Sequence, residues 1–390
     1  MEEWKTYTAS DFCIKVTDGT HDSPKPKDSG HYLITSKHLK DNCIDFSLAY
    51  RISEEDYQKI IKRSNVVQHD ILFSMIGTIG NIVRITAPIV DFAVKNMAIF
   101  KMGGNELKSK WLYYWLQSPS AKEYIASRLA GSTQAYLTLD SIRQYPISSP
   151  SEVEMKRIVD ILQSIDDKIE INNRINHNLE QQAQIVFDRI FNSDLTNNCL
   201  LSSIVDINPK RTLRKNEVAR CIDMTYLNTA GSFPSGWEFK PYSGGMKFIN
   251  GDTLMARITP CLENGKVAYI NFLDKEETAF GSTEYIVFHA KEGYPNEMFY
   301  FLTRNKAFIE FATKNMNGSS GRQRVSGETI GNYIIPVLSE DDIHELKTVC
   351  VSTMKEILKN NLESRVLSEM RNTILPKLMS GELKINDLTC

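Results

Sequence analysis

Two long stretches of the chain repeat apolar residues at alternating steps of four and three, the spacing of a coiled-coil seam. The first stretch predicts a helix over residues 151–195, and the second predicts a helix over residues 339–385. Helices of this length exceed those of ordinary globular domains, so we expect them to act as spacers. The first seam consists of Ile158, Leu162, Ile165, Ile169, Asn172, Asn176, Leu179, Ala183, Val186 and Ile190, and the second of Leu346, Cys350, Thr353, Ile357, Asn360, Ser364, Leu367, Arg371, Ile374 and Leu378.

Both seams become polar at the same two central positions, Asn172 and Asn176 in the first helix and Asn360 and Ser364 in the second. A buried polar residue in a seam costs stability but fixes register, because only one alignment gives the amides partners. We therefore predict that the two helices form an antiparallel coiled coil whose register these four residues set. The alternative is that each helix packs on its own globular part as a long amphipathic element.

The chain also repeats itself, because Ser151-Glu152 recurs as Ser339-Glu340, an offset of 188 residues. The same offset places Asn96–Phe100 over Glu284–Phe288, and further upstream it drifts to 182–185 residues, as loop insertions would cause. A pseudo-two-fold internal repeat follows. It predicts globular domains at residues 1–150 and 196–338, spacer helices at 151–195 and 339–385, and a tail at 386–390.

Each globular part mixes short strands with one helix. In the first, the pattern predicts a strand at 70–76, a turn, and a strand at 82–85, followed by a helix over 110–129. In the second it predicts strands at 252–258 and 267–270 and a helix over 296–314. The predicted fold class is α/β (α+β), in two copies. Pro376 should kink the second long helix or end it early.

Composition is that of an ordinary soluble globular chain, with 42% hydrophobic and 24% charged residues among 390. This excludes a disordered, collagen-like or disulfide-stapled protein. The 46 Lys and Arg residues against 48 Asp and Glu give no whole-chain basic signature of nucleic-acid binding. Divided at the predicted boundaries, however, the globular parts are slightly basic and the helices acidic, which permits contacts with phosphates.

The seven cysteines are scattered without the spacing of a zinc site, so we expect reduced thiols and no metal. The N-terminus has acidic residues where a signal peptide needs basic and apolar ones. No apolar run is long enough to cross a membrane. We therefore expect a cytoplasmic protein.

Several loops combine glycine with polar side chains. Gly318–Arg324 joins small residues to two arginines and a glutamine, side chains that suit guanine, phosphate or adenine. The alternative is a solvated turn after a helix. Similarly, His21 could stabilise its own turn, and Arg257 could pair with a nearby carboxylate such as Glu263.

No catalytic constellation emerges. Gly77–Gly80 lacks the third glycine and the following helix of a dinucleotide fingerprint, and the chain has no phosphate-binding lysine loop. We expect no catalytic residues and no resident cofactor.

In its duplicated layout and its motifs the chain resembles the specificity subunit of type I restriction-modification systems, over nearly its whole length. The stretches that carry the resemblance are Asp18–His21, Ile158–Leu162, Ile165–Ile169, Leu179-Glu180, Arg257–Lys266, Gly281–Glu284 and Gly318–Val325. One departure is visible at the head of each long helix. Where the family often has Pro-x-x-Glu-Gln, Val153 and Asp341 follow the glutamates here.

The resemblance implies a non-catalytic DNA-recognition subunit of a bacterial or archaeal complex. Each globular domain would read one half of a bipartite, asymmetric target in double-stranded DNA. The helices would dock two methyltransferase subunits, which in turn recruit motor-endonuclease subunits. S-adenosylmethionine, ATP and Mg would then belong to those partners. The alternatives are a specificity chain of another restriction-modification class and a coiled-coil scaffold that does not bind DNA.

Given this resemblance, we predict that polar loop residues of both domains contact DNA from the major groove. They are Thr20, His21, Asn81 and Gln134 in the first domain, and Arg257, Asn264, Lys266, Arg322, Gln323 and Arg324 in the second.

Overall fold

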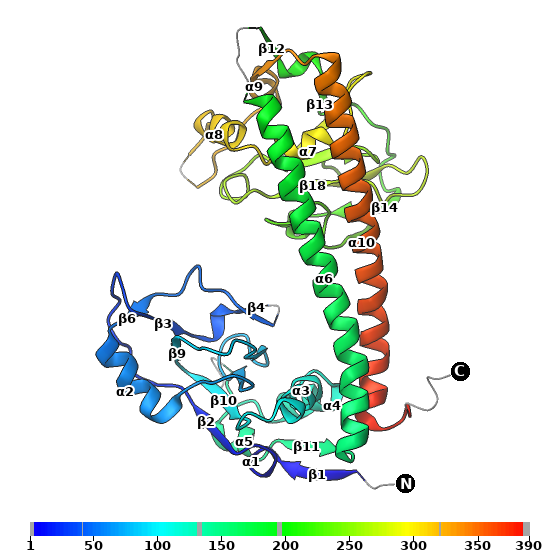
Figure 1. Cartoon of the computed structure of the whole chain (residues 1–390). Helices are drawn as coiled ribbons and strands as arrows, with labels where there is room; N and C mark the ends of the chain where they lie inside the picture. The colour runs from blue at the N-terminus through cyan, green and yellow to red at the C-terminus, as the bar shows by residue number, and fades with distance from the viewer. Residues whose placement is uncertain (1–3, 41, 131–134, 193–196, 320, 385–390) are drawn as a thin grey trace. The chain divides into compact units, whose positions relative to one another are not determined.

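The protein was studied as a computed structural model that describes residues 4–40, 42–130, 135–192, 197–319 and 321–384. It divides into a first unit, residues 1–167 with 367–390, and a second unit, residues 168–366. The boundary between the units lies within both long helices, α6 (Glu152–Phe191) and α10 (Glu340–Ser380). Each unit thus combines one α/β part with a segment of each long helix (Figure 1).

The described residues of the α/β part of the first unit form short strands and short helices before α6. Its strands are β1 (Lys5–Thr8), β2 (Lys15–Asp18), β3 (His31–Ile34), β4 (Leu39–Lys40), β5 (Cys43–Ile44), β6 (Arg51–Ile52), β7 (Ile71–Ser74), β8 (Ile82–Arg84), β9 (Phe92–Val94), β10 (Met97–Lys101) and β11 (Pro146–Ser149). Its helices are α1 (Ala9–Phe12), α2 (Glu54–Ser64), α3 (Glu106–Trp115), α4 (Pro119–Ser127) and α5 (Leu139–Arg143).

The α/β part of the second unit follows the same plan. Its strands are β12 (Asn198–Leu200), β13 (Val205–Ile207), β14 (Val218–Ile222), β15 (Glu238–Pro241), β16 (Lys247–Phe248), β17 (Thr253–Ala256), β18 (Val267–Tyr269), β19 (Ala279–Gly281), β20 (Tyr285–Ala290) and β21 (Ile334–Pro336). Its helices are α7 (Met298–Leu302), α8 (Lys306–Lys314) and α9 (Gly327–Gly331).

The central sheets of the two units correspond strand by strand. The central antiparallel sheet has the order β2-β10-β7-β8 in the first unit and β13-β20-β17-β18 in the second. A smaller sheet in each unit contains one parallel pair, β3 with β9 and β14 with β19. The predicted two-copy α/β architecture is confirmed, as are the two strand-turn-strand units that the sequence patterns indicated.

The prediction of a single helix over each of these two segments is wrong in both copies. Residues 110–129 fall on two helices, α3 and α4, and residues 296–314 on α7 and α8. The reason is an N-cap in the middle of each segment. Ser118 accepts a hydrogen bond from the backbone of Ala121, and Asn305 accepts one from Phe308. Short polar side chains compete with the helical backbone in this way and start a new helix.

Each long helix contributes to the core of both units. In the first unit, Ile158 and Leu162 of α6 and Leu378 of α10 are buried with Trp111 and other residues of the α/β part. In the second unit, Phe187 of α6 and Leu346 and Ile357 of α10 are buried with α7 and β20. Pro376 does not end α10, which continues to Ser380, because the apolar residues that follow Pro376 are buried in the core of the first unit.

One histidine of the first unit has two carboxylate partners. The Nε2 atom of His31 contacts Glu54, the first residue of α2, and its Nδ1 atom contacts Asp91 ahead of β9. The ring also stacks on Tyr57, with centroids 3.8 Å apart. Burial lowers the pKa of His31, but the hydrogen bonds to Glu54 and Asp91 outweigh it, so this pKa lies above its ordinary value of 6.5.

This arrangement predicts that His31 stabilises the fold less as the pH rises. A raised pKa means that the stabilising effect is complete below the ordinary value and is lost as the pH rises through the folded-state pKa. The gap in Tm between the wild type and His31→Gln should therefore narrow as the pH rises above the ordinary value of 6.5, as thermal denaturation would measure. His344→Gln, at an exposed position, is the control. A gap that is constant with pH would contradict the charged state of His31.

Candidate nucleic-acid interface

The described candidate residues lie near the same end of the central sheet in each unit. In the first unit, β2 ends where β10 begins, with Asp18 opposite Ala98, and the turn from β7 to β8 lies beside them. In the second unit, β17 ends where β20 begins, with Ala256 opposite Tyr285. Residues 20–21 and 81 therefore lie at one end of the central sheet, where its strands end or begin. Residues 257 and 266 lie at the equivalent end of the central sheet in the second unit.

At this end of the central sheet in the second unit, one carboxylate, Glu284, accepts hydrogen bonds from two arginines. Arg324 donates from Nε and Nη2 to the Glu284 oxygens at 2.8–2.9 Å, and Arg257 donates from Nε at 3.3 Å. The backbone joins the same segments, because the Val325 amide donates to the Arg257 carbonyl and the Thr259 amide to the Gln323 carbonyl. The predicted residues Arg257 and Arg324 are thus brought together, and the polar loop 317–325 is tied to the end of β17.

The charge state of this cluster follows from its geometry. The hydrogen bonds from Arg324 hold the pKa of the Glu284 carboxyl below its ordinary value, against the opposing effect of partial burial. Glu284 also raises the pKa of Arg324. The charge-assisted, forked contact orients Arg324 before any ligand binds, and Arg257 is oriented by its single hydrogen bond to the same carboxylate.

Other candidates of the second unit remain exposed. Arg322 has an exposed side chain for which the described residues supply no partner. Asn264 is exposed on the turn between β17 and β18. Gln323 is half-buried and makes its hydrogen bonds through its backbone carbonyl. Lys266 donates to the Met224 carbonyl at 2.8 Å, which fixes the chain before β18.

In the first unit, His21 lies between two partners at the end of β2. Its Nδ1 atom is 2.8 Å from Asn96 Oδ1, and its Nε2 atom is 2.8 Å from Asp18 Oδ2. Asp18 is held in turn by Arg63 at 3.0 Å. The His21 side chain is 68% exposed, so the ring is positioned without being covered. Thr20 is buried, and its hydroxyl accepts a hydrogen bond from the Asp22 backbone.

The remaining first-unit candidates are Asn81 and Gln134. Asn81 donates from Nδ2 to the Leu39 carbonyl at 2.8 Å and so ties the turn between β7 and β8 to β4. Gln134 lies outside the described residues.

The sequence patterns did not identify the residues that orient these candidates. The carboxylate beside Arg257 is Glu284, and Glu263, the partner considered from the sequence, is exposed. The signal that could have found the anchors is the repeat itself. Asn96 and Glu284 are equivalent under the 188-residue offset, and each contacts a candidate residue of its own unit.

The predicted register residues of the long helices meet in the second unit. Asn172 donates to Ser364 at 3.2 Å, and Asn360 donates to Asn176 at 2.8 Å. These two pairs exchange under the 188-residue offset, so the contact has the predicted pseudo-two-fold symmetry and runs antiparallel (Figure 1). Asn361 and Glu363, which the seam did not include, complete the polar layer by accepting hydrogen bonds from Asn176 and Asn172.

Two absences apply to the part of the chain that the structure describes. Within it, no group of three His, Cys, Asp or Glu residues is placed to hold a metal ion. Among the described helices, none combines the length and the apolar character needed to cross a membrane.

Comparison with known proteins yields one family. Residues 1–181 match the model of the type I restriction modification DNA specificity domain. The HindI specificity subunit of Haemophilus influenzae is 21% identical over 73% of this chain and 80% of that protein. The EcoAI specificity subunit of Escherichia coli is 31% identical over 142 residues, which are 35% of this chain and 24% of that protein.

A solved structure shares the fold along the whole chain. It is the crystal structure of the S subunit of a type I restriction-modification system from M. genitalium, with a TM-score of 0.58. The likeness covers 97% of this chain and 96% of that one at 15% sequence identity. Residues 1–181 are therefore similar to the type I restriction modification DNA specificity domain, and the whole chain shares its fold with the M. genitalium S subunit.

Proposed function

We propose that this chain is the DNA-recognition subunit of a type I restriction-modification complex, and that each unit reads one half of a bipartite DNA target. The observation that carries the proposal is the pair of equivalent ends of the two central sheets, where partly exposed polar side chains are held by neighbouring side chains. In the second unit these are Arg257 and Arg324 on Glu284, and in the first unit His21 between Asn96 and Asp18. Side chains held this way can donate to base edges or phosphates at little entropic cost.

The two units carry different chemistry at this edge. The second offers guanidinium groups, and the first offers an imidazole and amides. Because those groups prefer different base edges, we expect the two half-sites to differ in sequence. The specificity chain holds neither catalytic residues nor cofactors in this proposal, and methyl transfer and DNA cleavage belong to its partners.

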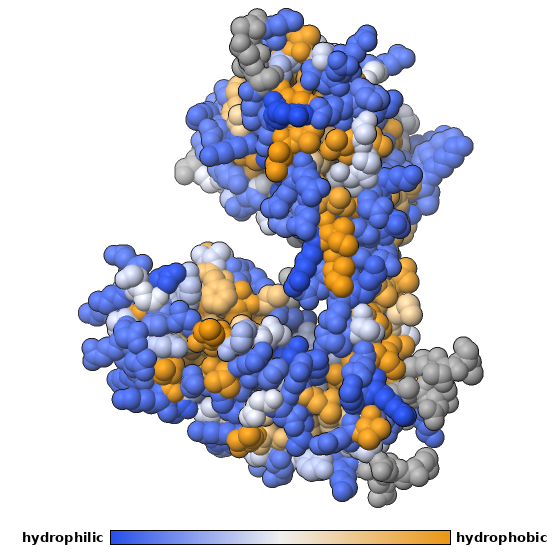
Figure 2. Space-filling view, in the orientation of Figure 1, coloured by the Kyte–Doolittle hydropathy of each residue, from blue (hydrophilic) through white to orange (hydrophobic). Residues whose placement is uncertain are grey.

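The long helices supply the docking surface for the methyltransferase subunits in this proposal. Around the Asn172–Ser364 contact, four apolar residues of the second unit are about half exposed: Ile171 (50%), Ile175 (41%), Leu362 (49%) and Val366 (55%). We call them the helix patch. Figure 2 shows apolar surface in a run along the long helices. Apolar residues that gather on the exposed side of a helix pair are typical of a protein interface.

We expect the double variant Ile171→Glu, Ile175→Glu to bind the methyltransferase subunit about 10- to 100-fold more weakly, since two desolvated side chains would become charged. Titration calorimetry with the purified methyltransferase subunit measures this. Lys355→Glu, at an exposed position of α10, is the control and should leave the affinity unchanged. Equal affinity of the double variant and the wild type would place the docking surface elsewhere.

The test of the proposed function is the methylation pattern that the chain directs. With its methyltransferase partner it should produce methylated bases in one bipartite, asymmetric motif, detectable by single-molecule sequencing of genomic DNA. A gel shift of the assembled complex on that motif separates this function from a coiled-coil scaffold, which would leave the DNA unshifted. A specificity chain of another restriction-modification class remains the second candidate, and the neighbouring partner genes distinguish it.

A further inference from the structure

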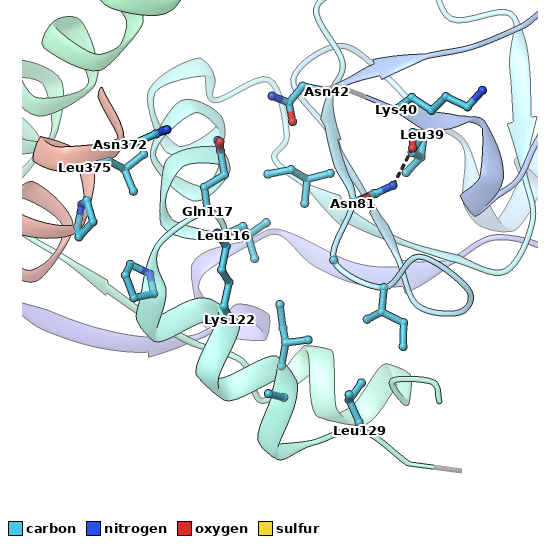
Figure 3. Close-up of a pocket in the computed structure, with 17 residues that line it drawn as sticks. Leu39, Lys40, Asn42, Asn81, Leu116, Gln117, Lys122, Leu129, Asn372 and Leu375 are labelled. Atoms are coloured by element: carbon cyan, nitrogen blue, oxygen red, sulfur yellow. Dashed lines mark hydrogen bonds between the residues drawn. The ribbon is translucent and has the colours of Figure 1, made fainter. Parts of the chain in front are cut away.

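A groove of about 950 Å³ opens in the first unit beside the turn from β7 to β8. The turn, the start of α4 and the last turns of α10 form its walls, and the β4–β5 hairpin forms its rim (Figure 3). Its lining is mixed, and the apolar residues Leu39, Ile79, Leu116, Ile125, Leu129 and Leu375 stand beside polar ones such as Asn42, Asn81, Gln117 and Lys122. Leu129 is 44% exposed there, and the side chain of Lys122 is exposed and has no ion-pair partner among the described residues.

The internal repeat supplies a comparison, because the second unit has the same walls. The turns correspond at Gly80 and Gly265, which both have a positive φ. The residues before the two helix caps correspond as Gln117 and Arg304. On the long helices, Pro376 corresponds to Asp188 under the 188-residue offset.

In the second unit a loop of the chain itself covers these walls. Arg304 donates to the carbonyls of Thr229 and Gly265 at 2.8 and 2.9 Å, and to that of Gly231 at 3.2 Å. The Ser232 carbonyl accepts from the Tyr269 amide at 2.7 Å, and its hydroxyl donates to Glu180 of α6. The next residue, Phe233, is buried against the same core.

The N-caps of α4 and α8 also differ in their contacts with the long helices. In the second unit, Asn305 donates to Asp188 at 2.7 Å and so joins α8 directly to α6. In the first unit the equivalent positions are Ser118 and Pro376, and proline has no side-chain acceptor. After Leu39 the chain forms the short β4–β5 hairpin, whereas after Leu227 it crosses the walls as the loop that ends in Phe233. Among its described residues, the first unit therefore has no equivalent of the segment that fills the groove of the second unit.

We propose that the groove of the first unit receives a loop of the methyltransferase subunit, with an apolar side chain in the position that Phe233 occupies in the second unit and a carboxylate beside it that pairs with Lys122. The inference rests on the proposed function and names a docking site in addition to the helix patch. Burial of one large apolar side chain in a formed groove is the usual anchor of a protein interface.

The lining favours a protein segment over DNA. A phosphate backbone is held by several cations, and this groove has only Lys40 and Lys122, of which Lys40 is already paired with Asp45 at 2.8 Å. The apolar residues would gain nothing from a phosphate, but they would be desolvated by an apolar side chain.

The experiment compares three variants of the full-length chain for binding to the purified methyltransferase subunit. Leu129→Glu places a charge at the exposed rim, Lys122→Glu reverses the cation, and Gln117→Arg puts into the groove the larger side chain that the second unit has at the equivalent position, Arg304. We expect each to weaken binding about 10-fold or more. Lys314→Glu, a charge reversal at an exposed position of α8 in the second unit, is the control, and it should bind as the wild type does.

Unchanged binding of all three variants, with the wild type and the helix-patch variant behaving as proposed, would overturn the groove proposal alone. Failure of the wild-type chain to bind the methyltransferase subunit would overturn both proposals. DNA affinity of the assembled complex is measured in parallel. A loss of DNA affinity with unchanged assembly would make the groove a DNA surface and overturn its assignment to a protein loop. Thermal denaturation verifies that Leu129→Glu is folded, and Gln117→Arg, which fills the groove without removing apolar surface, tests the proposal independently.

Discussion

Replacing Arg322 by Ala should weaken binding of the assembled complex to its target by about 1–3 kcal/mol, or roughly 5- to 150-fold, if its guanidinium forks onto a guanine. The structure leaves this side chain exposed and close to the Glu284 cluster, so its removal costs no internal contact of the described residues. The choice of base should relax in one half-site only, because Arg322 belongs to the second unit. Competition gel shifts with single-base variants of the target measure both effects.

The contrast with a phosphate contact is sharp. If Arg322 instead contacts a phosphate, the variant loses affinity equally on all sequences, and the salt dependence of binding becomes shallower. Lys314→Glu, on the helix that precedes the loop, serves as the control for a general change of charge. An unchanged methylation motif together with unchanged affinity would remove Arg322 from the DNA-binding surface.

Replacing Glu284 by Gln should destabilise the second unit and weaken recognition of the same half-site. The neutral amide cannot serve both guanidinium groups, so Arg257 and Arg324 lose their shared counter-charge, at a cost of about 1.5–3 kcal/mol. The freed arginines would also lose their orientation. We expect a lower Tm, measured by calorimetry, and weaker binding to one half-site.

The pH dependence gives this prediction a second readout. Because Arg324 lowers the pKa of Glu284, the stabilising effect is present above its ordinary value of 4.5 and is lost as the pH falls through the lower folded-state pKa. The gap in Tm between the wild type and Glu284→Gln should therefore close in acid. Glu263→Gln changes an exposed carboxylate of the same unit and should have no effect. An equal loss in both variants would show that Glu284 does not organise this edge.

The site was predictable from sequence only as far as loops and residue types. Glycine next to Arg, Asn and His identified the loops, since local composition reflects local conformation. The partners of those side chains were not predictable, because Glu284 is 40 residues from Arg324 and Asn96 is 75 residues from His21. Such pairs form only when strand register brings the ends of neighbouring strands together.

The boundaries of the shorter helices were also not predictable from the spacing of apolar residues alone. The apolar periodicity of residues 110–129 and 296–314 persists through Ser118 and Asn305, so a pattern of spacing alone runs two helices into one. Their N-caps depend on the φ and ψ angles of one residue, which a periodic pattern does not report.

By itself the sequence determined the duplicated plan, the two long helices and the four polar seam positions that meet between them. Heptad spacing and a constant offset are properties of the chain that no tertiary contact needs to reveal. Only the tertiary structure decided which arginines are paired at this end of the central sheet. Glu284 binds Arg257 and Arg324, and the Arg322 side chain stays exposed. The tertiary structure also decided that one repeat fills its groove with Phe233 while the other leaves it open. Both outcomes depend on contacts between distant segments, whose energies are set by geometry and burial.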